Sequence, residues 1–446
     1  MERTTAGTRS PGEVSTGLHR VAEVARRKPA VVMTALAHHI DRNLLHRAYQ
    51  GIRKDGAPGV DGRSARDYEE QLSANLDEVL SRFKSGSYRA PAVRRVHIPK
   101  GDGKSTRPIG IPTVEDKVLQ RAVVMVLEAI YEQDFLECSY GFRPRKSAHQ
   151  ALDRLRAGLM EMGGGVVIDV DVRSYFDTID HGHLRDFLDK RVRDGVIRKQ
   201  IDKWLKAGVM DGREMMYPRA GTPQGGVISP LLANVFLHEV LDTWFENEVK
   251  PRLKGAAFLV RYADDFVVAC SNGQDADRVM EVLPKRFGKY GLTIHPQKTR
   301  MVNFKRPREG DTKGSGSFDF LGFTHLWERS RKGRWVVKRK TAHKRLTRAV
   351  STVGTWCKEH RHWPIRVQHA AMSRKLVGHF GYYGITGNSK SISRFRHEAI
   401  RSWRKWLDRR GQRKSMSWAR FSRMLERYPL PPARAVHSIY RHAARP

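Results

Sequence analysis

Two apolar stretches that carry carboxylates decide the fold: VVIDVDVRSYFD at 166–177 and LVRYADDFVVA at 259–269. Their β-branched residues favour strands, whereas aspartate is depleted in strands and is rarely buried without a partner. The second stretch predicts a hairpin with Asp264 and Asp265 at its tip. Two Mg²⁺ ions held by Asp171 and Asp264 on adjacent strands would supply the missing counter-charge. Salt bridges to the chain's many cations are the alternative.

Helices and short strands surround these two stretches. Apolar spacing predicts a helix over about 114–131 and another from Tyr68 to Phe83, and VRRVHI at 93–98 predicts a strand. This mixture favours an α+β fold over a doubly wound parallel sheet. No run of about 18 apolar residues occurs, so we expect no transmembrane helix and no membrane partner.

The positive charge is concentrated near the C-terminal end. The 446 residues include 83 Lys and Arg against 47 Asp and Glu, a formal net charge of +36. Residues 331–446 hold 30 basic and 4 acidic residues, which is +26 of that total. This balance predicts a polyanionic partner, with nucleic acid favoured over an anionic membrane surface. The segment at 328–341, ERSRKGRWVVKRKT, marks the seam between two domains or a basic hairpin.

The basic tail also contains a helical pattern. The stretch SRFRHEAIRSWRKWLDRRGQRK at 393–414 predicts a helix that buries Trp403 and is capped by Gly411. We expect the tryptophans of the tail to form the core of a small helical domain, with base stacking as the alternative. The cations between them are the better candidates for phosphate contacts: Arg401, Arg404, Lys405, Arg409 and Arg410.

The cysteines argue against a disulfide-rich or cysteine-zinc protein. Cys138, Cys270 and Cys357 lie far apart, and no CxxC pair occurs. The N-terminal stretch also lacks the apolar core of a secretory signal. We therefore expect a cytoplasmic protein.

The motifs, taken in chain order, resemble those of bacterial group II intron-encoded reverse transcriptases, which are also maturases. The matching segments are GAPGVDG (56–62), IPKGDGKSTRPIGIPTVEDKVLQ (98–120), SYGFRPRKSAHQAL (139–152), DVRSYFDTIDH (171–181), GTPQGGVISPLLANVFL (221–237), RYADDFVV (261–268), GLTIHPQKT (291–299) and FDFLGF (318–323). Beyond residue 340 the likeness to the family's thumb or maturase domain is weaker. No cysteine follows Cys357, so the resemblance is to members that lack the endonuclease with paired cysteines.

This resemblance implies a right-hand polymerase fold, with fingers and a palm built on an antiparallel sheet, followed by an α-helical thumb or maturase domain. The expected segments are a mobile N-terminal segment at 1–30, fingers with an N-terminal extension at 31–165, a palm with the aspartate triad at 166–330, and a basic thumb/maturase domain with a DNA- or RNA-binding tail at 331–446.

Roles follow by matching positions to the family's motifs. The resemblance implies that Asp171, Asp264 and Asp265 are the catalytic residues and hold two Mg²⁺ ions, for which Mn²⁺ could substitute. Asp169 does not match a catalytic position. Phe176 would be the aromatic gate beneath the sugar of the incoming dNTP, with core packing as the alternative.

The remaining matches are basic or polar residues. Four would contact the nucleotide: Lys100, Arg107, Gln224 and Lys298. For the first two, a solvated basic turn is the alternative and Lys104 is a competitor; Lys298 could equally be an ordinary surface lysine. Template phosphates would be gripped by Arg143, Arg145 and Lys146.

The resemblance thus implies an RNA-directed DNA polymerase that works by two-metal nucleotidyl transfer and assists intron splicing through its basic thumb. Its partners would be structured intron RNA, as template and splicing substrate, a DNA target or primer, and dNTPs, in the bacterial cytoplasm. Monomer and dimer both stay open. Two other functions are considered: a similar enzyme recruited by the host for DNA repair or phage defence, and an RNA-binding splicing cofactor with an idle polymerase.

Overall fold

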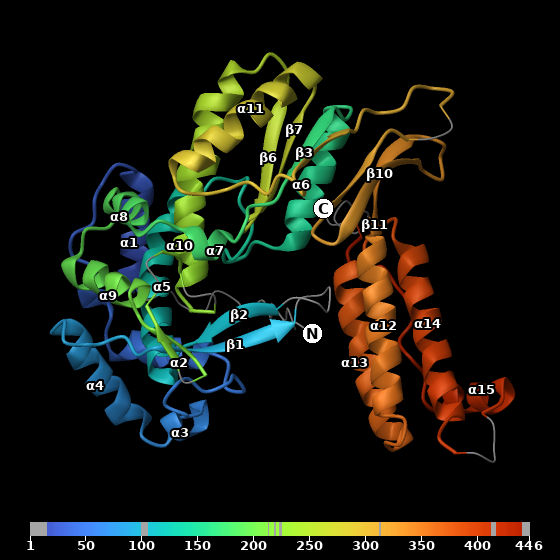
Figure 1. Cartoon of the computed structure of the whole chain (residues 1–446), viewed down its shortest axis with the longest axis horizontal. Helices are drawn as coiled ribbons and strands as arrows, with labels where there is room; N and C mark the ends of the chain where they lie inside the picture. The colour runs from blue at the N-terminus through green and yellow to red at the C-terminus, as the bar shows by residue number, and fades with distance from the viewer. Residues whose placement is uncertain are drawn as a thin grey trace. The chain divides into compact units, whose positions relative to one another are not determined.

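The computed structural model describes residues 16–99, 106–212, 214–217, 220–222, 225–311, 314–411 and 416–438. The chain forms two compact units. The first, which we call the body unit, comprises residues 7–155 and 166–301. The second, the C-terminal unit, takes in residues 156–165 and the chain from 302 onward. Their elements are shown in Figure 1, and each unit is described by itself.

One long buried helix organises the body unit. Helix α5 (Val114–Asp134) starts at an N-cap, Thr113, whose hydroxyl accepts from the amide of Asp116. Valine, leucine and isoleucine side chains occupy most of its circumference and are buried, as expected for a helix enclosed by others. Helices α1, α2 and α10 pack against it (Figure 1). The helix predicted over 114–131 is therefore confirmed, and it extends to Asp134.

The other helices of the body unit are shorter. They are α1 (Thr16–Arg27), η1 (Ala37–His39), α2 (Arg42–Gly51), α3 (Ala65–Glu69), α4 (Leu72–Lys84), α6 (Ala148–Glu161, which continues into the C-terminal unit), α7 (Tyr175–Thr178), α8 (His181–Asp189), α9 (Gly195–Leu205), α10 (Ser229–Leu237), η2 (His238–Asp242), η3 (Phe245–Val249), η4 (Lys250–Arg252) and α11 (Gly273–Lys289).

The helix predicted from Tyr68 to Phe83 is in fact two helices. A reciprocal capping box between Ser64 and Asp67 starts α3 earlier than expected. Gln71 has a non-helical backbone with φ −121° and ψ 34°, which interrupts the run before α4 begins. The apolar spacing continues across Gln71, so the sequence pattern does not reveal this break.

A four-stranded sheet with the order β2-β1-β4-β5 lies in the body unit. Strand β1 (Val93–Pro99) pairs antiparallel with β2 (Thr106–Ile111) and parallel with β4 (Val209–Asp211). Strand β5 (Glu214–Met216) completes it as a hairpin with β4. The strand predicted at 93–98 is confirmed.

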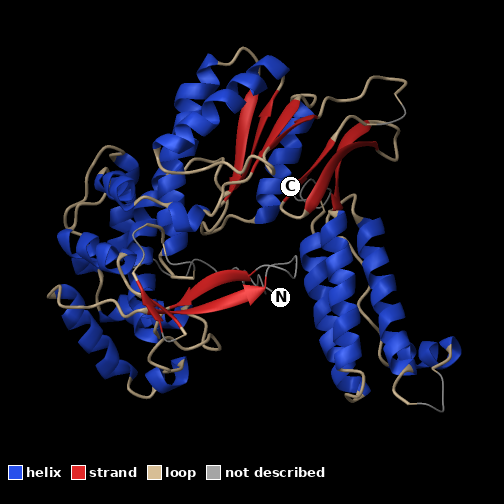
Figure 2. Cartoon of the chain, in the orientation of Figure 1, coloured by secondary structure: helices blue, strands red, loops and turns tan. Residues whose placement is uncertain are grey.

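A second sheet has the order β6-β7-β3-β8, and helix α11 packs against two of its strands (Figure 2). The strands are β6 (Ala257–Tyr262), β7 (Asp265–Cys270), β3 (Val166–Val170) and β8 (Arg300–Asn303). Strand β7 pairs antiparallel with both β6 and β3. The α+β class is confirmed by these largely antiparallel sheets among helices.

The C-terminal unit joins a small sheet to helices. Antiparallel strands β9 (Ser317–Phe320), β10 (Phe323–Arg329) and β11 (Trp335–Thr341) form the sheet, so the basic segment at 328–341 is a hairpin. The helices are α12 (His343–Glu359), α13 (Ile365–Tyr383), α14 (Ser389–Asp408) and α15 (Trp418–Arg427). Residues 302–330, which we assigned to the palm segment, belong to this unit.

Trp403 of α14 is completely buried, and its indole N–H donates to the Gln368 side chain at 2.8 Å. The tryptophan is therefore a core residue of this unit, as predicted. The predicted helix at 393–414 starts four residues earlier and ends at Asp408, before Gly411. None of the described helices is long and apolar enough to cross a membrane.

Candidate polymerase site

The acidic hairpin ends in a two-residue turn. Tyr262 and Asp265 form the last pair between β6 and β7, which leaves Ala263 and Asp264 in the turn. Ala263 has a positive φ of 58°, the backbone state that tight hairpin turns require. The turn holds Asp264 half-buried and Asp265 exposed.

Asp171 follows directly after β3, the strand next to β7. Its carbonyl accepts from the amide of His295 at 2.8 Å, so the segment at 291–299 is paired with it. Burial raises the pKa of Asp264, the negative charge of Asp171 raises it further, and Arg107 opposes the shift. The structure thus brings the two predicted carboxylates and one predicted cation into the same electrostatic environment.

Two lysine or arginine side chains already neutralise aspartates of this sheet. Lys298 Nζ donates to Asp171 Oδ2 at 2.8 Å. Arg300 of β8 donates instead from Nε to Oδ2 of Asp169 at 3.1 Å, and Asp169 is the aspartate of β3 that matches no catalytic position. In the described part of the chain, no three Asp, Glu, His or Cys side chains gather closely enough to form a ready-made metal site.

The buried side chain of Arg261 holds the turn that carries Asp264. Arg261 is fully buried and makes a two-point ion pair with Asp242, at 2.6 Å and 2.8 Å. Its remaining donors reach the carbonyl of Ala263 at 3.0 Å, the side chain of Asn234 at 2.9 Å and the hydroxyl of Ser139 at 2.7 Å. Asp242 lies in η2, a π-helical segment, and such segments are often found at functional sites. One side chain therefore links three other segments, at 139, 234 and 242, to the turn that carries Asp264.

Described residues at both ends of the GTPQGG segment (221–226) contact predicted site elements, Phe176 on one side and strand β2 on the other. The amide of Thr222 donates to the carbonyl of Phe176 at 2.8 Å. On the other side, a Cβ added to Gly225 (φ +109°) would lie 2.4 Å from the carbonyl oxygen of Gly110 in β2. Only glycine permits this contact. The ring of Phe176 is half-buried and packs edge-on against Tyr175, with 5.5 Å between centroids.

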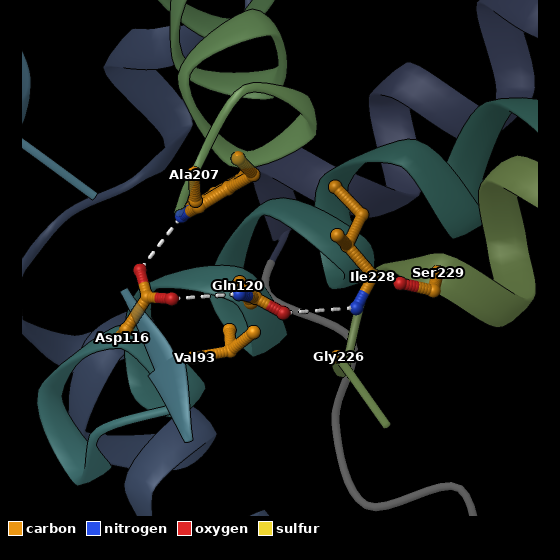
Figure 3. Close-up of a pocket in the computed structure, with 8 residues that line it drawn as sticks. Val93, Asp116, Gln120, Ala207, Gly226, Ile228 and Ser229 are labelled. Carbon is orange, nitrogen blue, oxygen red and sulfur yellow. Dashed lines mark hydrogen bonds between the residues drawn. The ribbon is translucent and has the colours of Figure 1, made fainter. Parts of the chain in front are cut away.

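A buried chain of hydrogen bonds holds Ile228, two residues after this segment (Figure 3). The amide of Ile228 donates to Gln120 Oε1 at 3.2 Å, and Gln120 Nε2 donates to Asp116 Oδ2 at 2.8 Å. Asp116 Oδ1 accepts from Trp204 Nε1 at 2.6 Å and from the Tyr88 hydroxyl at 3.1 Å. Burial raises the pKa of Asp116 to about 6. Among the described residues no cation bonds Asp116, so this carboxylate depends on neutral donors, and its Oδ2 in turn orients the Gln120 amide.

The three predicted template-binding cations differ in their surroundings. Arg143 is buried: it pairs with both carboxylate oxygens of Glu132 and donates to two main-chain carbonyls. This burial disfavours a direct phosphate contact. Lys146 pairs with exposed Glu137 at 2.6 Å, and Arg145 is exposed.

The cations of α14 divide in the same way. Arg404 donates to the carbonyl of Met416 at 2.8 Å and lies over the ring of Trp418. Arg410 donates to two carbonyls, those of Arg361 and Trp363. The other three predicted cations have exposed side chains: Arg401, Lys405 and Arg409. Lys100 and Gln224, and the competitor Lys104, lie outside the described residues.

Several residues of the site were not singled out from the sequence. Arg261 stands beside the acidic motif, but arginine is so common in this chain that only its place inside an apolar strand marks it. Asp116 and Gln120 are polar residues on a helix that is otherwise apolar, which is a usable signal of a buried network.

The family of reverse transcriptases (RNA-dependent DNA polymerases) matches residues 98–325, about half of the chain. The chain belongs to this family. It is 34% identical to protein YkfC of Escherichia coli over 306 residues, which cover 62% of this chain and 77% of YkfC. It is 35% identical to the group II intron-encoded protein LtrA of Lactococcus lactis over 228 residues.

The match to LtrA covers 50% of this chain and only 37% of LtrA, so the chain corresponds to much less than the length of that relative. A nuclear intron maturase 2 of Arabidopsis thaliana mitochondria is 30% identical over 330 residues, 63% of this chain and 43% of that protein. The resemblance to group II intron-encoded reverse transcriptases and maturases is thereby confirmed.

Replacing Arg261 by Met should reduce the free energy of unfolding by about 3–5 kcal/mol, because Asp242 would be left as a buried, unpaired charge. The double substitution Arg261→Met with Asp242→Leu should restore most of that loss. It should not restore primer extension, because the Ala263 carbonyl still lacks its donor. Chemical denaturation and primer extension measure the two effects separately. Full recovery of extension in the double variant would contradict the positioning of the turn by Arg261.

Replacing Gln120 by Glu should cost about 1–3 kcal/mol of unfolding free energy, because two carboxylates would face each other where a donor faced an acceptor. The exchange Asp116→Asn with Gln120→Glu should recover most of it. In that variant the asparagine amide donates to the new glutamate, which still accepts from Ile228. Urea denaturation of both single variants and the double variant tests this, and purely additive losses would exclude the hydrogen-bond chain.

Proposed function

We propose that the protein is the RNA-directed DNA polymerase of a group II intron and that it also assists splicing of the intron RNA. The observation that carries the proposal is that the negative charge of Asp171 acts on Asp264, while Arg107 opposes this effect and Lys298 bonds Asp171. The reverse transcriptase family supplies the chemical class, and the names of the intron-encoded and maturase relatives support the second role.

We assign the parts of a right-handed polymerase as follows. The β2-β1-β4-β5 sheet and the helices around α5 would form the fingers, and the β6-β7-β3-β8 sheet with α11 would form the palm. Helices α12, α13 and α14 would form the thumb or maturase domain. This assignment agrees with the order of the motifs along the chain, and the four predicted segment boundaries remain part of the proposal.

Reverse transcriptases use divalent metal ions, and carboxylate oxygens are the ligands that Mg²⁺ prefers. Asp171 and Asp264 suit such an ion, because the negative charge of Asp171 raises the pKa of Asp264 and a bound cation would relieve that repulsion. Lys298, which pairs with Asp171, would have to give up this carboxylate. Asp171, Asp264 and Asp265 would hold two Mg²⁺ ions. When bound, Mg²⁺ supplies positive charge that favours the ionised primer hydroxyl and the departing pyrophosphate.

The chain's own residues orient the reactants. The primer 3′-oxygen forms a bond to the α-phosphorus of the dNTP, and the bond from that phosphorus to the pyrophosphate oxygen breaks. Arg107, together with Lys100, would bind the triphosphate, and Lys298 would pass from Asp171 to a phosphate oxygen. Phe176 would lie beneath the sugar and exclude a 2′-hydroxyl, while Gln224 would position the nucleotide against the template.

The splicing role would depend on exposed charge. Arg401, Lys405 and Arg409 are exposed on α14 and at its end, whereas neighbouring cations donate to carbonyls of their own unit. We propose that these three side chains contact phosphates of the intron RNA, and, separately, that Arg145 and Lys146 of the body unit contact phosphates of the template.

The catalytic assignment can be tested by primer extension on an RNA template with dNTPs and Mg²⁺. Asp264→Ala should reduce the rate by more than about 100-fold, because a metal ligand is lost. Asp169→Asn is the matched control, because it removes the negative charge of another carboxylate in the same sheet, the one that pairs with Arg300. Extension should then change by less than about twofold. Equal loss in both variants would mean that the sheet, and not the catalytic turn, had been damaged.

The RNA-binding assignment predicts a change in salt dependence. A variant with Arg401, Lys405 and Arg409 all replaced by Ala should bind intron RNA with a log–log salt slope that is less steep by about 2, at roughly 0.7 per phosphate contact. Arg404→Ala should lower the melting temperature instead and leave the slope nearly unchanged. Filter binding at several salt concentrations gives the slopes. An unchanged slope in the triple variant would remove α14 from the RNA interface.

A further inference from the structure

Phe142 lies in a loop that is fixed on both sides. Before it, the Tyr140 amide donates to the carbonyl of Arg261 at 2.9 Å, and Gly141 accepts from Asn234 Nδ2 at 2.7 Å. After it, the buried guanidinium of Arg143 pairs with Glu132 and donates to the carbonyls of Leu136 and Ser139. The loop is thus held to the same network as the catalytic turn.

The loop also touches the catalytic turn directly. A Cβ added to Gly141 would lie 2.2 Å from the amide nitrogen of Ala263, so the two backbones are in contact there. Phe142 is the next residue along the chain. Its position is therefore set by the backbone that carries Asp264.

Phe142 itself is neither relaxed nor buried. Its φ is +57°, a genuine outlier for a bulky residue, and 55% of the residue is exposed. It is the one phenylalanine among the exposed large apolar residues of the described chain. Both features reduce stability.

Backbone strain is concentrated around this site. Five described non-glycine residues have a positive φ, and four of them lie in loops of the site: Phe142, Arg145, Ser174 and Ala263. Such strain persists where the surroundings over-determine a conformation, which is typical of functional sites. Here the fixed loop presents an exposed aromatic ring and, three residues later, an exposed arginine.

We propose that Phe142 stacks on an unpaired base of the RNA template beside the catalytic turn, while Arg145 contacts the adjoining phosphate. An aromatic ring is attracted to any base face, and stacking is independent of sequence. Bases inside a duplex are already stacked on both sides, so the ring requires a single-stranded template. This inference rests on the proposed polymerase function, because it places a template at the turn.

The test uses fluorescence anisotropy with two labelled RNA–DNA hybrids, one blunt and one with a single-stranded template overhang. Phe142→Ala and Phe142→Gly should each weaken binding of the overhang hybrid by roughly 5- to 150-fold, the range expected for loss of one base stack. Binding of the blunt hybrid should stay within twofold, and Phe142→Trp should retain wild-type affinity for both. Val282→Ala, which shortens an exposed apolar side chain on α11, is the control and should change neither.

Thermal melting separates the contact from the strain. Phe142→Gly should raise the melting temperature because glycine accepts the positive φ, whereas Phe142→Ala should not, and yet both should lose the same affinity. Arg145→Ala should reduce the steepness of the salt slope by about 0.7, and Phe142→Ala should leave it unchanged.

Unchanged affinity of the glycine variant for the overhang hybrid would overturn the proposal, as would an equal loss on the blunt hybrid. Neither readout requires nucleotide addition. Failure of the stacking proposal is therefore distinguishable from failure of the polymerase function.

Discussion

The ion pair between Arg261 and Asp242 is the interaction on which the site depends. Two charges buried together are stable only if the geometry is good and the remaining donors are satisfied, and here every terminal nitrogen of the guanidinium has a partner. Those partners come from the segments at 139, 234, 242 and 263. A buried pair whose individual net stability is modest therefore holds four segments in register around Asp264.

The same constraint explains the close backbone contacts. Gly141 must lie against Ala263, and Gly225 against Gly110, because these loops have no room for a side chain between anchors that are already fixed. Thr222 is held by the carbonyl of Phe176, and Ile228, two residues after the GTPQGG segment, is held by Gln120. The backbone of Phe176, the residue proposed to lie beneath the sugar of the nucleotide, thus has a fixed partner, as precise positioning of reacting groups requires.

The sequence predicted the parts of this fold that depend on local pattern. Strand composition identified β3 and the β6–β7 hairpin, and apolar spacing identified α5 and the buried face of α14 around Trp403. It could not reveal that Asp242 faces Arg261, because that pairing depends on a π-helical segment nineteen residues away. The division between α3 and α4, and the exposure of Phe142, likewise depend on backbone states that side-chain pattern does not encode.

Some cations of this chain bond other groups of the protein and others have exposed side chains, and a count of charges cannot distinguish the two kinds. A net charge of +36 indicates a polyanionic partner, but it does not say which arginines meet it. Arg143, Arg404 and Arg410 donate to carboxylates or carbonyls of the protein itself, so they stabilise loops and helix ends. Arg145, Arg401 and Arg409 keep exposed side chains in the same sequence neighbourhoods. Because a guanidinium has five donors in a fixed plane, it can lock a loop as readily as it can grip a phosphate, and only its surroundings decide between the two.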